Sequence, residues 1–377
     1  MSFTPLGLSS SLLNALYNLD YKRPYPIQKA IIPHIIEGKD VLGIAQTGSG
    51  KTASYILPIL MRLQSKKAIG NRHPEVLVLA PSRELVIQIE EVFKMFSSEL
   101  PEPIESLAVY GGKSINPQML ALPNVRFLVA TPGRLLELLE LNAVNLSRID
   151  VLVLDEADKL LNSGFRKEME MLLEYLPKQR QNLLFSATLS EAVSSVKEIL
   201  LHRPVVINVE EEKEALSQIK QLAYRVSNEK KGPLLRHIIK TNNFSQVLVF
   251  VSSGHRAEAV ARKLTNNKIQ SISIHGKLSQ SARIDALNLF KNKKVQVLVS
   301  TDLLSRGIDI SYMPCVINYE LPRSSKDYIH RIGRTGRAKH SGLAISLVAP
   351  EEESHFKIIQ KKIKKWIDII DSQNIDW

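Results

Sequence analysis

The sequence has little of what several protein classes depend on. Its 377 residues include one cysteine, Cys315, which excludes a disulfide framework and a cysteine-based zinc site. No uninterrupted apolar run approaches the roughly 20 residues of a transmembrane helix. The opening segment, Met1–Ser10, has no basic start and no long apolar core, so we predict no secretory signal. These absences favour a reducing compartment, and we predict a cytoplasmic protein.

Hydrophobic residues make up 44% of the chain, which excludes wholesale disorder. The net charge of +12 is unevenly spread: residues 1–216 hold 23 Lys and Arg against 25 Asp and Glu, whereas residues 217–377 hold 27 against 13. A basic domain beside a near-neutral one favours a polyanionic partner, most often nucleic acid. Surface lysines that merely keep a domain soluble would give the same composition.

Short apolar runs alternate with amphipathic stretches in both halves of the chain. The alternation is interrupted by the acidic stretch Glu210–Glu214, which we interpret as part of a solvated linker at 210–216. Runs that are apolar throughout are typical of strands covered on both faces, and their alternation with helices predicts parallel sheets. We therefore predict two α/β domains, 1–209 and 217–377. The predicted strands are Val41–Ala45, Val76–Ala80, Leu107–Tyr110, Phe127–Ala130, Val151–Leu154, Leu183–Phe185, Val205–Val209, Ala223–Val226, Val247–Val251, Ile269–Ile274, Val295–Ser300, Val316–Tyr319 and Ala344–Val348.

A glycine-rich turn follows the first predicted strand and precedes a helical pattern, which is the context of a phosphate-binding P-loop. The turn is Gln46–Thr52, and Gly48 and Gly50 let its backbone N–H groups converge. Lys51 can reach the β- and γ-phosphates, and the Thr52 hydroxyl can bind Mg²⁺. Ala45 stands where the general pattern has its first glycine.

Acidic residues follow another predicted strand, Val151–Leu154. Parallel sheets place ligand chemistry at the carboxyl ends of their strands. Asp155 is placed there to hold Mg²⁺, and the adjacent Glu156 to orient and deprotonate water. The second domain has no equivalent Gly-Lys pair, so we predict one nucleotide per chain. Instead it offers three arginines within His330–Arg337, which suit γ-phosphate oxygens, although a solvent-facing basic loop is the simpler alternative.

Taken together, these blocks resemble the DEAD-box ATP-dependent RNA helicases of superfamily 2, and the opening residues Met1–Ser9 look most like the bacterial RhlE-type members. Two departures are Ser82, where the family usually has Thr, and Ser252-Ser253, where Asn-Thr is commoner. The matching blocks are Arg23–Gln28 with Phe3, Ala45–Thr52, Pro81–Leu85, Gly111-Gly112, Thr131–Arg134, Asp155–Asp158, Ser186–Thr188, Val249–Ser253, His275-Gly276 with Gln280 and Arg283, Thr301-Asp302 with Arg306–Asp309, and His330–Arg337.

The resemblance implies two tandem RecA-like domains with the ATP site in the cleft between them. Gln28 would read the adenine edge, Phe3 would lie near the base and Asp309 near the ribose, while Arg334 and Arg337 would act as fingers on the γ-phosphate. The implied catalytic residues are Glu156, Lys51, Asp155, Arg334 and Arg337. The implied ATP-binding residues are Phe3, Gln28, Ala45, Gln46, Thr47, Gly48, Ser49, Gly50, Lys51, Thr52 and Asp309. Asp158, Ser186, Thr188 and His330 would couple the ATP site to the domain interface.

The resemblance also implies RNA bound across both domains, through backbone contacts without sequence preference. The implied RNA-contacting residues are Pro81, Arg83, Gly112, Thr131 and Arg134 in the first domain, and Gly276, Arg283 and Thr301 in the second. Hydrolysis would then require domain closure, which would locally unwind a short duplex or remodel an RNA–protein complex. We expect the core to be monomeric.

Three alternatives concern the function and the end of the chain. Another superfamily 2 motor is disfavoured by Asp158 and by the Gln28 block. A non-hydrolysing RNA clamp is disfavoured by Lys51, Glu156, Arg334 and Arg337. The segment Glu351–Asp371 carries an apolar helical stripe among lysines, which predicts a terminal amphipathic helix packed on the second domain. An added RNA-contacting surface is the alternative interpretation of that helix.

Overall fold

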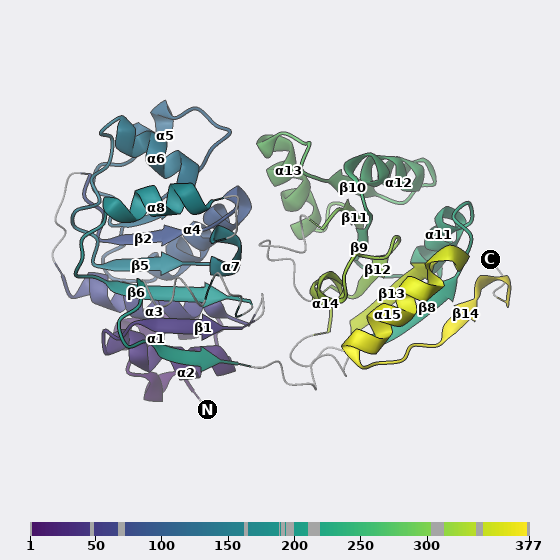
Figure 1. Cartoon of the computed structure of the whole chain (residues 1–377), viewed down its shortest axis with the longest axis horizontal. Helices are drawn as coiled ribbons and strands as arrows, with labels where there is room; N and C mark the ends of the chain where they lie inside the picture. Colours follow the sequence, from purple (N-terminus) through teal and green to yellow (C-terminus); the bar gives the residue numbers. More distant parts are fainter. Residues whose placement is uncertain are drawn as a thin grey trace. The chain divides into compact units, whose positions relative to one another are not determined.

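The computed structural model describes residues 2–45, 49–66, 72–161, 165–187, 189, 193, 200–209, 219–302, 313–336 and 342–374. Within them the chain divides into two compact units, Met1–Glu210 and Glu211–Trp377. Each unit is built around a parallel sheet with helices on both faces (Figure 1).

The first unit contains a sheet of seven described strands in the order β3-β4-β2-β5-β6-β1-β7. Every pairing in it is parallel, and β1 lies between β6 and β7. After β2 the chain continues to one side of the sheet, and after β5 it continues to the other side, so the direction of chain progression reverses between these two strands. Open sheets bind ligands at such a reversal, outside the carboxyl ends of the strands. The strands are β1 (Val41–Ile44), β2 (Val76–Leu79), β3 (Ser106–Val109), β4 (Phe127–Ala130), β5 (Val151–Leu154), β6 (Gln181–Ser186) and β7 (Val205–Asn208).

Two groups of helices bury the two faces of this first sheet. One core lies between the sheet and α1 to α4, and the other lies between the sheet and α5 to α8. Successive strand residues alternate between the cores, as in β1, where Val41 belongs to one and Leu42 to the other. The helices are η1 (Thr4–Leu6), α1 (Ser10–Asn18), α2 (Pro26–Ile36), α3 (Lys51–Gln64), α4 (Arg83–Ser97), α5 (Asn116–Leu120), α6 (Pro132–Glu140), α7 (Ala157–Leu160) and α8 (Arg166–Glu174).

The second unit repeats the plan with the strand order β10-β11-β9-β12-β13-β8-β14, again parallel throughout the described residues. Helices α11 and α12 bury one face, and α13, α14 and α15 bury the other. The strands are β8 (Ile219–Arg225), β9 (Val247–Phe250), β10 (Ser271–Ile274), β11 (Val297–Ser300), β12 (Cys315–Asn318), β13 (Gly342–Val348) and β14 (Ile369–Asp371). The helices are α11 (Lys231–Thr241), α12 (Gly254–Asn266), α13 (Gln280–Lys291), α14 (Ser325–Ile332), η2 (Pro350–Glu352), α15 (Glu353–Ile363) and η3 (Ser372–Asn374).

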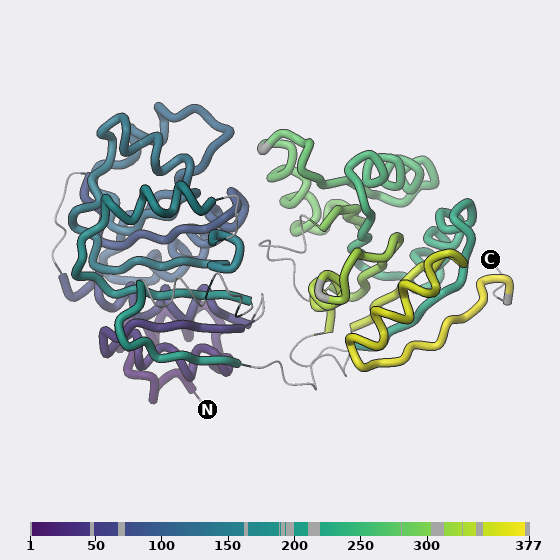
Figure 2. Tube along the Cα trace, in the orientation of Figure 1, coloured from purple at the N-terminus to yellow at the C-terminus, as the bar shows by residue number. Residues whose placement is uncertain are grey.

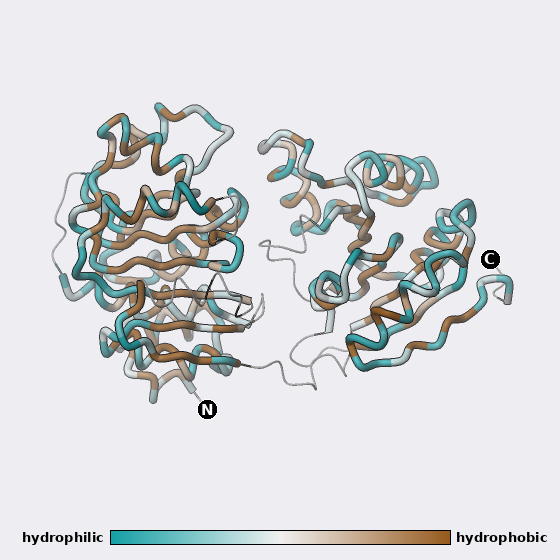
Figure 3. The backbone as a smooth tube through the Cα atoms, in the orientation of Figure 1, coloured by the Kyte–Doolittle hydropathy of each residue, from teal (hydrophilic) through white to brown (hydrophobic). Residues whose placement is uncertain are grey.

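The apolar strands lie at the centre of each unit, where Figure 3 shows them as continuous hydrophobic tracks. All four residues of β2 and of β5 are at most 1% exposed. Burying each such side chain stabilises the fold by about 1.5–3 kcal/mol. The prediction of two α/β units with parallel sheets is confirmed.

No helix among the described residues is both long enough and apolar enough to cross a membrane.

The predicted terminal helix is wrong beyond Ile363. Helix α15 ends there because Lys364 adopts a left-handed backbone, with φ at 54°. The chain then runs back along the unit, as the yellow trace in Figure 2 shows, and Ile369–Asp371 pairs with β8 as strand β14. Trp366, expected in the apolar stripe, is 72% exposed.

Candidate nucleotide and RNA sites

Most of the predicted site residues of the first unit follow the carboxyl ends of its strands, whereas Phe3 and Gln28 precede the first strand. The predicted phosphate-binding, catalytic and coupling residues follow β1, β5 and β6, which are neighbours in the sheet. Those predicted to bind RNA follow β2, β3 and β4, which are also neighbours, and β2 pairs with β5 where the two groups meet. The topology therefore divides one edge of the sheet into two adjacent candidate sites.

The phosphate-binding turn joins β1 to α3. Gly50 begins α3 with φ at 89°, and a Cβ there would lie 2.7 Å from Nε2 of Gln28, so the position requires glycine. Lys51 is 6% exposed, and its Nζ donates a hydrogen bond to the Ala45 carbonyl at 2.5 Å. Gln46, Thr47 and Gly48 lie outside the described residues.

The electrostatic environment of Lys51 is set by burial and by nearby acids. Burial lowers the pKa of its ammonium group, and the carboxylates of Asp155, Glu156 and Asp158 oppose that shift. The lysine therefore lies within the field of all three acids of the strand β5 turn. A bound phosphate would add further negative charge beside these three carboxylates, and a cation would have to balance it.

Gln28 connects α2 to the phosphate-binding turn. It is 1% exposed, its Oε1 accepts from the Tyr25 backbone N–H at 2.8 Å, and its Nε2 donates to the Gly50 carbonyl at 3.1 Å. An amide oxygen has a second lone pair and an amide nitrogen a second hydrogen. Gln28 can thus hold the turn in place and still offer one donor and one acceptor to a base.

Asp155 is fixed at the end of β5 by two hydrogen bonds. Its Oδ1 accepts from the Glu156 backbone N–H and its Oδ2 accepts from the Tyr55 hydroxyl, both at 2.9 Å. Burial raises the pKa of the Asp155 carboxyl, and the nearby Lys51 opposes that rise. The carboxylate keeps a lone pair on each oxygen, because each oxygen can accept more than one hydrogen bond.

Glu156 takes a left-handed backbone conformation, with φ at 53°, at the start of α7. For a non-glycine residue this costs about 1–2 kcal/mol. Its side chain is 5% exposed, and Oε2 pairs with Nζ of Lys159 at 2.6 Å. Backbone strain of this kind clusters at active sites and ligand-binding segments.

Two predicted coupling residues meet within the first unit. The Ser186 hydroxyl, at the end of β6, donates to Oδ1 of Asp158 at 2.9 Å, and both residues are buried. Ser186 also accepts the Ala45 backbone N–H through its carbonyl, at 3.0 Å. The acidic turn and the phosphate-binding turn are therefore linked through β6. Thr188 lies outside the described residues.

Phe3 lies apart from these contacts in the sequence but within the same unit. It is 4% exposed and belongs to the hydrophobic core that lies beneath α2 and α3. Tyr25 packs against that core as a partly buried side chain. The placement of Phe3 near a base stays a prediction.

The predicted RNA residues of the first unit come together although they are distant in sequence. The Arg83 guanidinium lies over Gly112, so close that a Cβ on Gly112 would come within 2.0 Å of Nη1. Gly112 has φ at 82°, which also requires glycine. Pro81 precedes α4 by two residues, and Thr131 directly precedes α6 without a side-chain capping bond.

Arg134 is more buried than an RNA-contacting side chain was expected to be. It is 7% exposed, its Nη2 donates to the Lys113 carbonyl at 2.9 Å, and its Nε pairs with Glu137 at 2.8 Å. Arg134 therefore ties the start of α6 to the loop after β3. The neighbouring Thr131 remains partly exposed.

In the second unit the predicted RNA residues follow β10 and β11, which are paired. Gly276 is exposed after β10, Thr301 is partly exposed after β11, and Arg283 is 9% exposed on α13. His275, just before Gly276, packs on Gly254, where a Cβ would lie 2.8 Å from Nδ1. The second unit thus also presents its candidates at the carboxyl edge of its sheet.

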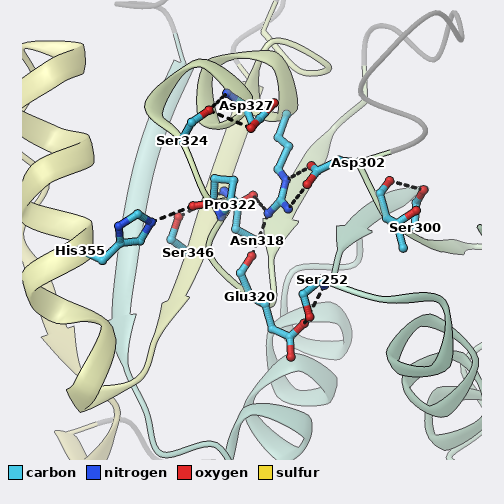
Figure 4. A network of polar contacts seen from close by, with 12 residues as sticks. Ser252, Ser300, Asp302, Asn318, Glu320, Pro322, Ser324, Asp327, Ser346 and His355 are labelled. Atoms are coloured by element: carbon cyan, nitrogen blue, oxygen red, sulfur yellow. Dashed lines mark hydrogen bonds and ion pairs between the residues drawn. The ribbon is translucent and has the colours of Figure 1, made fainter. Parts of the chain in front are cut away.

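A polar network that includes Asp302, Asn318 and Glu320 holds this edge of the second unit together (Figure 4). Arg331 is 1% exposed, and its guanidinium donates to both oxygens of Asp302, at 2.6 and 3.0 Å. It also donates to Oδ1 of Asn318 at 3.2 Å and to the Glu320 carbonyl at 2.8 Å, and it lies 5.1 Å from the Phe250 ring centroid. One arginine thereby joins α14 to the ends of β9, β11 and β12.

Glu320 extends the network to the segment that follows β9. Its carboxylate accepts the Ser252 backbone N–H at 2.7 Å and the Ser252 hydroxyl at 2.5 Å, and it pairs with Arg256 at 2.9 Å. Burial would raise the pKa of Glu320, but the Ser252 bonds and Arg256 outweigh it and lower the pKa. The serine that departs from the family pattern is thus engaged inside its own unit.

Replacing Asp302 with alanine is expected to destabilise the second unit by about 2–3 kcal/mol, because the buried Arg331 guanidinium loses both hydrogen bonds of its carboxylate partner. Chemical denaturation of native chain and variant, followed by the far-ultraviolet signal, measures the change. Alanine at the exposed Asp285 of α13 is the control. Equal denaturation midpoints for native chain and Asp302 variant would contradict this role of the pair.

Of the remaining predicted residues, Arg334 and His330 lie at α14. His330 lies on the last turn of the helix, and Arg334 follows it, 3% exposed, with its carbonyl accepting the Met313 backbone N–H at 2.9 Å. Asp309 and Arg337 lie outside the described residues.

The sequence pattern gave no role to Tyr55, Asp302 or Glu320. Arg331 was one of the three arginines expected to suit γ-phosphate oxygens, and for Arg331 this expectation is wrong, because its guanidinium is buried and bound to Asp302 within the second unit. A hydroxyl in the otherwise apolar run of α3 was a signal for Tyr55, since buried tyrosines usually have a polar partner. The acidic residues after β11 and β12 were signals for Asp302 and Glu320, because these strand ends meet at one edge.

Each half of the chain matches a known protein family. A family model for DEAD/DEAH box helicases matches residues 25–196, and one for the helicase conserved C-terminal domain matches 230–339. The ATP-dependent RNA helicase CshA of Listeria monocytogenes is 35% identical over 364 residues, covering 96% of this chain and 69% of the relative. CshA of Bacillus cereus is 36% identical over 377 residues, covering 100% and 70%.

A solved structure extends the likeness to the whole fold. S. cerevisiae Dbp5 bound to RNA and ADP–BeF₃ has 29% identity and a TM-score of 0.83, covering 98% of this chain and 95% of that one. Together with a phosphate-binding turn after β1 and an acidic pair after β5, this makes the chain an ATPase with two RecA-like domains. It belongs to the DEAD-box ATP-dependent RNA helicases, whose ATPase activity depends on RNA.

Proposed function

We propose that the chain closes its two domains, 1–209 and 217–377 around the linker 210–216, on ATP and RNA, and thereby unwinds short RNA duplexes or remodels RNA–protein complexes. The observation that carries this proposal is the division of labour between the units. The first supplies the phosphate-binding turn and the acidic pair, whereas the second supplies Arg334 and Arg337, which follow α14 in the sequence. Neither unit alone holds a complete hydrolytic site, so turnover requires both.

ATP is held by the residues that converge around the turn after β1. Lys51 binds the β- and γ-phosphates, and the backbone from Ala45 to Thr52, with Gln46, Thr47, Gly48, Ser49 and Gly50, surrounds them. Gln28 reads the adenine edge with its second donor and acceptor, Phe3 supports the base and Asp309 approaches the ribose. The hydrogen bond from Gln28 to Gly50 supports this role, because it makes base recognition and phosphate binding share one contact.

Mg²⁺ is the metal that this donor set fits. The candidate ligands are the Thr52 hydroxyl and the Asp155 carboxylate, and Mg²⁺ in phosphate sites typically takes one or two protein oxygens and keeps several waters. The open lone pair on each Asp155 oxygen supports contacts made largely through water. When bound, the ion would neutralise phosphate charge.

Hydrolysis uses groups from both units. Glu156 takes a proton from the attacking water, and Arg334 and Arg337 stabilise the charge that develops on the γ-phosphate. Asp158, Ser186, Thr188 and His330 couple this chemistry to domain closure. The bond between Ser186 and Asp158 supports that coupling, since it links the acidic turn to the strand that leads toward Thr188.

RNA is bound along the other half of each sheet edge, through phosphate and 2′-hydroxyl contacts that carry no sequence information. Pro81, Arg83, Gly112, Thr131 and Arg134 contribute from the first unit, and Gly276, Arg283 and Thr301 from the second. The close approach of Arg83 to Gly112 and the RNA-bound Dbp5 structure support this arrangement.

Three further assignments complete the proposal. We assign the chain to the RhlE-type branch of the family because its opening residues, Met1–Ser9, and the Gln28 block look most like those members. The core acts as a monomer, because each chain carries both halves of one hydrolytic site. The single cysteine, Cys315, is buried, which suits a cytoplasmic protein.

The test is ATP turnover with and without RNA. Because ATP and RNA each bind both domains in the closed state, saturating single-stranded RNA is expected to lower the Kd for ATP by roughly 5- to 150-fold and to raise turnover. A DNA strand of the same sequence is the control and is expected to stimulate little. Equal stimulation by DNA would refute the RNA assignment, and binding without any stimulation would favour a non-hydrolysing clamp.

A further inference from the structure

The hydroxyl of Tyr55 points at the acidic turn from inside the first unit. Tyr55 lies one turn into α3 and is 0% exposed. Its hydroxyl donates to Oδ2 of Asp155 at 2.9 Å, across 100 residues of sequence. Thr52 lies three residues earlier on the same helix. One buried hydroxyl therefore contacts one candidate Mg²⁺ ligand, Asp155, from the helix that carries the other candidate, Thr52.

The ring of Tyr55 has a separate structural role. It packs against Phe185 of β6, with centroids 5.0 Å apart and planes at 46°. A phenylalanine would make the same contact and fill nearly the same space, so packing alone does not require a hydroxyl. The hydroxyl instead serves a carboxylate, and such charge-assisted hydrogen bonds are roughly twice as strong as neutral ones.

The orientation of the Asp155 carboxylate depends on this bond. Its other oxygen, Oδ1, accepts the Glu156 backbone N–H, so two donors on opposite oxygens fix the plane of the group. With Tyr55 fully buried, water cannot easily take the place of its hydroxyl. Without that donor, the carboxylate is free to turn toward the Lys51 ammonium, because the two opposite charges attract each other.

We propose that Tyr55 is a positioning residue that holds the Asp155 carboxylate in place for Mg²⁺ before the metal and the nucleotide bind. This inference rests on the Mg²⁺ role proposed above for Asp155. Helix α3 would then have two roles. Its first residue is Lys51, and Tyr55, one turn later, orients the carboxylate of Asp155.

The test is the Tyr55→Phe variant, assayed by binding of a fluorescent ADP analogue to the full chain. Mg²⁺ is titrated at fixed analogue, and analogue affinity is also measured in excess EDTA. The half-saturating Mg²⁺ concentration is expected to rise about tenfold, equivalent to ~1.4 kcal/mol, near the low end for a hydrogen bond to a charged group. Affinity in EDTA is expected to change less than about twofold, since Tyr55 acts through a metal ligand.

The matched control is Tyr224→Phe, which removes a partly buried hydroxyl from β8 of the second unit. It is expected to leave both measurements unchanged. If Tyr55→Phe leaves the Mg²⁺ dependence unchanged, or weakens binding equally in EDTA and in Mg²⁺, Tyr55 is only a packing residue and the proposal fails. If the native chain itself shows no Mg²⁺ dependence, the metal assignment fails, and that failure is recognised before any variant is compared.

Discussion

The Glu156→Gln variant is expected to hydrolyse ATP about 10²- to 10⁴-fold more slowly than the native chain, which is the usual contribution of a general base. Glutamine has the same size and the same backbone preferences, so the left-handed turn at 156 is retained. What it loses is the ability to take a proton. ATP binding is expected to be retained or tightened, because one of the three negative charges around Lys51 is removed.

The measurement is RNA-stimulated phosphate release at saturating ATP, together with ATP and RNA affinities. Glu170→Gln is the matched control, because Glu170 also pairs with a basic residue, Arg166, but lies exposed on α8. That control is expected to turn over normally. Normal turnover by the Glu156 variant would show that another group activates the water, and the assignment of Glu156 would be wrong.

The Arg334→Ala variant is expected to lower turnover by about 10³- to 10⁵-fold, the range typical of arginine fingers in nucleotide hydrolysis. The reason is that developing charge on the γ-phosphate loses its guanidinium partner, whereas the phosphate-binding turn of the first unit is untouched. ATP affinity in the absence of RNA is therefore expected to change little. The same phosphate-release assay, run beside ATP binding, separates the two effects.

Because Arg334 is 3% exposed, its removal could also weaken the second unit. Arg334→Lys addresses this, since lysine keeps the charge and most of the volume but lacks the planar fork that suits phosphate oxygens. It is expected to lose nearly as much turnover while melting close to the native temperature. Alanine at Arg262, an exposed residue of α12, is the control. Fast hydrolysis by Arg334→Lys would argue against a finger at this position.

The sheets were predictable because their strands are short runs that are apolar throughout. β5, for example, consists of Val151–Leu154, and no residue of it is exposed. The end of the chain was not predictable in the same way. Ile363, Trp366 and Ile370 have helical spacing, but the last of them lies in a strand that forms only because β8 offers a free edge. Spacing records local periodicity and contains no information about that distant partner.

The same distinction applies to the candidate sites. Lys51, Asp155 and Glu156 were predicted because each belongs to a short pattern that follows its own strand: the glycine-rich turn after β1, or the acidic residues directly after β5. The bonds from Tyr55 to Asp155 and from Arg331 to Asp302 join residues 100 and 29 positions apart. Each depends on which strand ends are neighbours in the folded sheet, which no local sequence pattern specifies.

The left-handed backbone at Glu156 has a consequence for engineering this chain. Glycine or asparagine would adopt that conformation at lower cost, so a search for heat-resistant variants that ignores activity would tend to select them there. Such variants would gain thermal tolerance and lose the proposed base. At position 156, thermal stability and ATP turnover therefore favour different residues. A stabilised but active enzyme would need its stabilising substitutions at other positions in the fold.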